Sequence, residues 1–97
     1  AMQDRIMRFA ERWSTLHDAP VELGPLMREA FLRGSLPRSE AARILNKPER
    51  TARRYVTDFI EQGLLCSDSV GGPLSISFSS KTVGYFFPRL YPEGVEI

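Results

Sequence analysis

Three arginines fall within five positions of the chain, Arg50, Arg53 and Arg54, and Thr57 follows them. At about 100° per residue, these four side chains share one arc of an α-helix. A guanidinium group can grip guanine with two hydrogen bonds or neutralise a phosphate, so this arc has the chemistry of a nucleic-acid contact. The opposite arc is apolar, which predicts a helix that is buried on one side. Its members are Ala52, Tyr55, Val56, Phe59 and Ile60.

A second group of candidate residues precedes this helix. Arg38 and Ser39 begin a shorter predicted helix, whose N-terminal amides and arginine we expect to hold a phosphate. Lys47, in the turn between the two helices, adds a cation near the same surface. The candidate DNA-binding residues are therefore Arg38, Ser39, Lys47, Arg50, Arg53, Arg54 and Thr57.

Charge is concentrated in the same part of the chain. Residues 28–54 hold eight basic and three acidic side chains, a net charge of +5, whereas residues 1–27 carry −1 and residues 55–97 carry −3. The total of +1 neither requires nor excludes a nucleic-acid partner. The uneven distribution is more informative, because it places a basic centre between acidic flanks.

Apolar periodicity and turn residues predict the elements that position these side chains. Helices are expected over residues 2–16, 22–33, 37–45 and 48–62. Gly34, Asn46 and Gly63 suit the backbone after three of these helices, and Pro37 and Pro48 each suit a helix start. Strands are expected over residues 64–67 and 74–78, with a turn at 69–73, and residues 35–36 could add one rung to the sheet.

This order predicts a mainly α fold with a small β-hairpin, a winged helix-turn-helix preceded by an N-terminal connector helix. We expect residues 1–18 to form the connector, with Ala1-Met2 as a cloning remnant. Residues 19–97 would form the winged domain with an aromatic C-terminal tail. Ninety-seven residues with 42% hydrophobic side chains suit one folded domain with a modest core.

Several kinds of site are not expected. One cysteine and one histidine give no internal disulfide and no set of metal ligands, and no residue spacing supports catalysis or a cofactor. No apolar run reaches the roughly 18 residues that span a bilayer, and no segment resembles a secretory signal. We therefore expect a cytoplasmic chain with no membrane contact.

A protein-directed role is the alternative to DNA binding. The predicted turn at residues 69–73 has no Lys or Arg and adjoins Asp68, although a DNA-reading wing usually offers cations. Glu49, Asp58 and Glu61 also weaken the positive field of the arginine-bearing helix. The aromatic tail over residues 83–91 could cover the core or dock on another domain, and a homodimer stays open.

Five pieces of the chain carry a family resemblance, at residues 32–45, 49–54, 63–69, 72–74 and 87–92. In this order they resemble the C-terminal domain of Fic-family proteins, and the resemblance covers roughly residues 22–92. It is carried by the order of these pieces, including the closing Phe-Pro-Arg-Leu-Tyr-Pro. At the turn, Asn46-Lys47-Pro48 stands where the family pattern has Gly-Val-Ser, so a capping serine worth about 1 kcal/mol is absent.

This resemblance implies a bacterial parent enzyme that transfers AMP from ATP to a protein hydroxyl. The family's catalytic domain lies upstream and carries a His-Pro-Phe loop followed by a Gly-Asn-Gly-Arg anion cradle. Neither motif occurs in this chain, so we expect no transferase activity from it. The upstream catalytic domain would then be its partner within the same protein, and residues 2–16 would be the connector.

Overall fold

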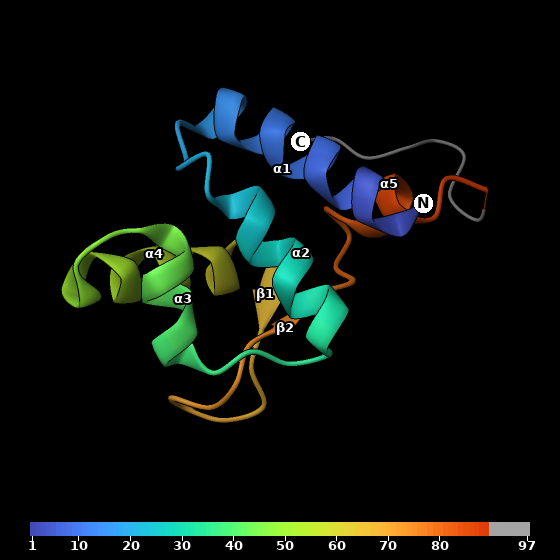
Figure 1. Ribbon diagram of the computed structural model, residues 1–97. Helices are drawn as coiled ribbons and strands as arrows, with labels where there is room; N and C mark the ends of the chain where they lie inside the picture. Colours follow the sequence, from blue (N-terminus) through green and yellow to red (C-terminus); the bar gives the residue numbers. More distant parts are fainter. Residues whose placement is uncertain (90–97) are drawn as a thin grey trace.

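The computed structural model describes residues 1–89, which form a mainly helical fold with a small antiparallel sheet (Figure 1). The elements in chain order are α1 (Met2–His17), α2 (Leu23–Arg33), α3 (Arg38–Leu45), α4 (Glu49–Glu61), β1 (Leu65–Cys66), β2 (Ser75–Ile76) and α5 (Val83–Phe86). The predicted class, mainly α with a β-hairpin, is confirmed. The four long helices each begin and end within one residue of the predicted positions.

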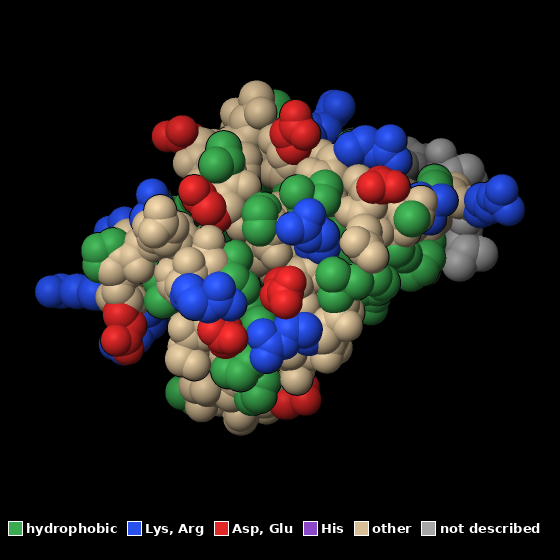
Figure 2. Space-filling model, viewed as in Figure 1, with side chains coloured by type: hydrophobic (Ala, Val, Ile, Leu, Met, Phe, Trp, Pro, Cys, Tyr) green, Lys and Arg blue, Asp and Glu red, His purple; other side chains and the backbone are tan. Residues whose placement is uncertain are grey.

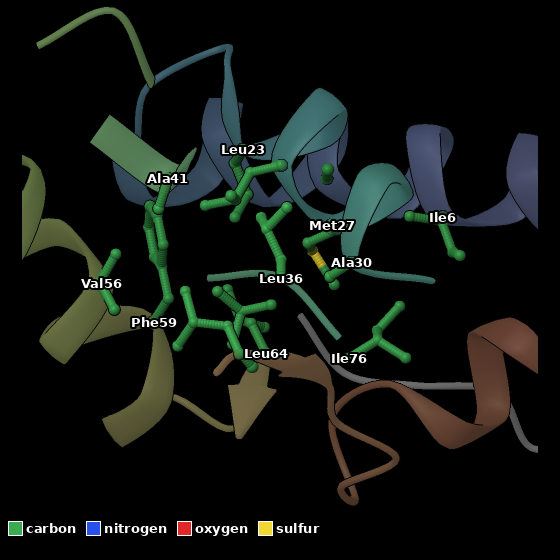
Figure 3. Packing of buried hydrophobic residues seen from close by; sticks show 14 of the residues in the cluster. Ile6, Leu23, Met27, Ala30, Leu36, Ala41, Val56, Phe59, Leu64 and Ile76 are labelled. Atoms are coloured by element: carbon green, nitrogen blue, oxygen red, sulfur yellow. The ribbon is translucent and has the colours of Figure 1, made fainter. Parts of the chain in front are cut away.

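One hydrophobic core joins the elements. α2 lies between α1 and the hairpin (Figure 1), so its apolar side chains are covered from both sides. Figure 3 shows Leu23, Met27 and Ala30 of α2 among side chains from α1, α4 and the hairpin. All three are fully buried.

α1 contributes an aromatic edge to this core. Phe9 is fully buried, and Trp13 is 3% exposed. Trp13 stacks on the ring of His17 with 3.9 Å between centroids, and the Lys81 ammonium lies 5.4 Å from its ring centroid. Lys81 also donates a hydrogen bond to Gln62 at the end of α4, so this lysine links α4 to α1.

The connection from α3 to α4 is a tight turn. Asn46 adopts a left-handed conformation with φ 54°, as an asparagine after a helix can. Pro48 has φ −55° and occupies the N-cap position rather than the predicted first helical position. Its carbonyl accepts the hydrogen bond from Ala52 at 2.9 Å and so starts α4 without a side-chain cap.

The sheet is shorter than predicted but has the expected extra rung. Leu65 pairs with Ile76 and Cys66 with Ser75, and residues 67–74 connect the two strands. Leu36 forms an isolated antiparallel bridge with Leu74, with two backbone hydrogen bonds of 2.8 Å. This bridge ties the segment between α2 and α3 to the hairpin.

The C-terminal aromatic segment, for which the sequence predicted no helix, contains a short one. The Ser79 carbonyl accepts from the amides of Thr82 and Val83, and Thr82 also bonds through its hydroxyl to the Ser77 carbonyl at 2.7 Å. These bonds start the short helix α5, which places Phe86 fully buried against Phe9 at 5.6 Å between ring centroids. The segment therefore covers the core. The tail residues 90–92 that the resemblance used lie outside the described residues.

Phe86 offers a test of how tightly α5 is held. Phe86→Ala should lower the free energy of unfolding by about 3–5 kcal/mol, since it empties a fully buried ring site. Urea denaturation followed by circular dichroism measures the change. Phe78→Ala is the matched control, because Phe78 contacts Phe86 but is 53% exposed, and should cost about 1 kcal/mol or less. Equal losses in the two variants would contradict a buried α5.

Candidate nucleic-acid interface

The outward face of α4 brings four of the seven predicted residues together. Ala52, Val56 and Phe59 are buried on one side of the helix, which turns the opposite side to solvent. A shallow depression on that side is lined by Arg50, Thr51, Arg53, Arg54, Thr57, Asp58 and Glu61. The predicted arc is therefore a continuous surface.

Arg50 and Arg54 are the exposed cations of this surface that form no ion pair with any of residues 1–89. The guanidinium carbon of Arg54 lies 5.6 Å from the ring centroid of Tyr55, which steadies the side chain without neutralising it. Both charges are available to an incoming anion.

Arg53 is held by a carboxylate of its own helix. Its Nη2 lies 3.1 Å from Oε1 of Glu49, and the two side chains are 71% and 82% exposed. An exposed pair four residues apart on a helix contributes only about 0.3–0.5 kcal/mol. A phosphate can therefore displace Glu49, but Arg53 is less available than the sequence prediction implied.

Arg38 has a protein partner that no sequence pattern indicates. Its side chain is half-buried, and Nε donates a 2.8 Å hydrogen bond to the carbonyl of Gly72, in the turn of the hairpin. The partners are 34 residues apart, and a loop carbonyl leaves no pattern in a sequence. Ser39 beside it is exposed.

A groove of about 390 Å³ separates α3 and α4 from the hairpin turn. Ala42, Ala52 and Val56 supply its apolar lining, and Gly71 supplies the wall on the hairpin side. Its polar lining comes from Arg38, Ser39, Glu49 and Arg53. The groove thus joins Arg38 and Ser39 to Arg53 of the α4 surface, whereas Lys47 is exposed in the α3–α4 turn and lines neither site.

Two arginines of the basic segment, residues 28–54, form ion pairs with a neighbouring carboxylate. Glu40 of α3 accepts a 2.9 Å hydrogen bond from Arg43 and a 3.4 Å bond from Arg33 at the end of α2. The hydrogen bond and charge of Arg43, followed by those of Arg33, hold the pKa of Glu40 below its ordinary value. Figure 2 shows basic and acidic side chains intermingled on the face of α2 and α3, so this face has no uniform sign of charge.

Two other kinds of site are absent from the part of the chain that the structure describes. Within residues 1–89, no three His, Cys, Asp or Glu side chains are grouped as a metal ion would require. Over the same residues, each helix is too short or too polar to traverse a lipid bilayer.

No family model, no curated protein and no solved structure matches this chain. The candidate interface therefore depends on its own geometry and charge.

The Arg33–Glu40–Arg43 cluster makes a prediction about pH. Because the pKa of Glu40 is depressed in the folded chain, its stabilising contribution is present above the pKa of the unfolded chain and is lost as pH falls through the folded value. Arg43→Ala should move the Glu40 pKa upward, as measured by a carboxyl NMR titration. Arg12→Ala on α1 removes the same charge elsewhere and should leave that pKa unchanged. If the pKa of Glu40 does not change in Arg43→Ala, Arg43 is not the cause of its depression.

Proposed function

We propose that this chain is a non-catalytic winged helix-turn-helix domain that binds duplex DNA through α4. In this assignment α3, the turn at residues 46–48 and α4 are the helix-turn-helix, and the β1–β2 hairpin is the wing. The Leu36–Leu74 bridge supports this assignment, because the bridge joins the wing to the segment that leads into α3.

The exposed guanidinium face of α4 carries the proposal. A helix fits the major groove of DNA, where arginine side chains reach base edges and phosphates. The buried Ala52, Val56 and Phe59 fix which side of α4 faces outward, so Arg50 and Arg54 need no rearrangement to meet DNA.

The residues divide into two roles. Arg50, Arg54 and Thr57 lie on the open face and are assigned to the major groove. Arg38, Ser39 and Arg53 line the groove beside the wing and are assigned to phosphates, which set the register of the protein on the duplex. Lys47 supplies a further cation from the α3–α4 turn.

The resemblance to Fic-family C-terminal domains supplies the larger context of the proposal. A DNA-binding or regulatory domain of this kind would accompany an upstream AMP-transferring domain of the same protein. The chain itself would position that enzyme without taking part in its chemistry.

The wing favours a second candidate function, a protein-interaction or dimerisation module. Val70 near its tip is fully exposed, Asp68 adds a negative charge, and residues 67–73 hold no cation. An apolar tip with no positive charge suits a protein surface better than a phosphate backbone.

Salt-dependent binding to random duplex DNA tests the primary proposal. The double variant Arg50→Ala/Arg54→Ala should weaken binding about tenfold or more at low salt, because it removes two arginines of the α4 face that form no ion pair with any of residues 1–89. The slope of log affinity against log salt should fall in magnitude by about 2, one for each phosphate that is no longer neutralised. Fluorescence anisotropy at several salt concentrations measures both.

Arg8→Ala/Arg12→Ala is the matched control for that experiment. It removes the same charge from α1, away from the proposed interface, and should leave the affinity within about twofold. Equal losses from both double variants would show that net charge, rather than the α4 face, governs binding. No salt-dependent binding by the unmodified chain would favour the protein-interaction module.

A variant of Glu49 should raise DNA affinity, whereas the arginine variants lower it. Glu49→Gln removes the carboxylate that holds Arg53, so DNA affinity should rise several-fold and the salt slope should steepen by about 1. Glu11→Gln on α1 is the control for the removed negative charge. The same anisotropy titration measures both variants, and a fall in affinity for Glu49→Gln would contradict the assigned role of Arg53.

A further inference from the structure

We propose that Arg38 is a positioning residue that replaces a missing rung of the sheet and fixes the wing beside α4. This inference rests on the proposed function, because it assigns the wing its place at the DNA site. Leu36 and Leu74 form an antiparallel bridge in which each amide donates a hydrogen bond to the carbonyl of the other residue. In an antiparallel pair, the next such exchange falls two residues further along each strand.

The next rung would join residues 38 and 72. That rung does not form through the backbone, because the chain leaves the extended conformation at Arg38, where α3 begins, and no backbone hydrogen bond joins residues 38 and 72. The Gly72 carbonyl instead accepts from Nε of Arg38 at 2.8 Å, so a side-chain N–H donates where a strand amide would have done.

The wing has few other attachments beyond Leu74. Among residues 1–89, the Arg38–Gly72 bond is the one side-chain hydrogen bond that joins residues 67–73 to a helix. The remaining bonds of the turn are local, from the Gly72 amide and the Ser67 hydroxyl to the Ser69 carbonyl. Without Arg38, the wing would be fastened only at its base.

The tie matters because the wing forms one wall of the groove. Gly71, next to the bonded carbonyl, faces Arg53 and Val56 of α4 across that groove. A wing that swings outward widens it and carries the backbone of residues 70–72 away from a DNA strand lying there. Arg38 therefore sets the distance between wing and α4 before DNA arrives, which lowers the ordering cost of binding.

Arginine is suited to this task in a way that lysine is not. Nε makes the bond to Gly72, and the terminal nitrogens of Arg38 have no hydrogen-bond partner among the described residues. They can meet a phosphate while Nε still holds the wing. A lysine ammonium at position 38 has one nitrogen to share between the two.

Hydrogen exchange in the free chain tests the tie without DNA. Arg38→Ala and Arg38→Lys should speed exchange of the Gly72 amide, because its bond to the Ser69 carbonyl opens more often in a wing that Arg38 no longer holds. For alanine we expect about a tenfold increase, which corresponds to ~1.4 kcal/mol. The Leu74 amide, bonded to Leu36 at the base of the wing, should change less than about twofold. Arg43→Lys on the same helix is the control, because Arg43 bonds to Glu40 and not to the wing.

DNA binding by the charge-conserving variants tests the positioning role. Arg38→Lys should bind random duplex about three- to tenfold more weakly than Arg43→Lys, at equal net charge and unchanged melting temperature. Unchanged Gly72 exchange in both Arg38 variants would overturn the tie. A loosened wing with unchanged affinity in Arg38→Lys would overturn its link to DNA.

DNA binding by the chain and the role of Arg38 in holding the wing can fail independently. If the unmodified chain shows no salt-dependent DNA binding, the proposed function fails. The exchange measurements still decide whether Arg38 holds the wing. Should Arg38→Ala fail to fold, Arg38→Lys carries the same test.

Discussion

The burial of one side of α4 is the constraint from which the rest of the structure follows. Ala52, Val56 and Phe59 pack into the common core with side chains from the other helices and the hairpin. Once these three are buried, the 3.6-residue period leaves no freedom in where the remaining positions point. The three arginines of α4 are exposed because they lie opposite these buried side chains. The groove beside the hairpin turn exists because α3 and the hairpin flank the same helix.

Local chemistry made most of the fold predictable. Apolar spacing located the long helices to within a residue, and the left-handed Asn46 followed from the tolerance of asparagine for that conformation. The single rung at Leu36 could be suggested from the short connection alone, although its partner could not. The α5 helix escaped prediction because it is four residues long and begins with bonds to the Ser77 and Ser79 carbonyls, which no apolar period marks.

The candidate site was less predictable than the fold, and the reason is physical. The α4 arc followed from helical geometry, but its electrostatics depended on pairings that vary with rotamer and tertiary placement. Glu49 lies four residues before Arg53, a spacing that signals an ion pair in any helix, so this partner could have been anticipated. The partner of Arg38 could not, because a backbone carbonyl 34 residues away is defined only by the folded chain.

The single tryptophan lies where it reports on one side of the core. Trp13 of α1 is stacked on His17 and capped by Lys81, whose ammonium also reaches Gln62 at the far end of α4. The fluorescence of Trp13 therefore reports on the contact between α1, the C-terminal segment and the last turn of α4. Arg50 lies in the first turn of that helix, at the opposite end from Gln62. Intrinsic fluorescence and far-ultraviolet dichroism would consequently diverge during denaturation if α1 detached before the remaining helices melted.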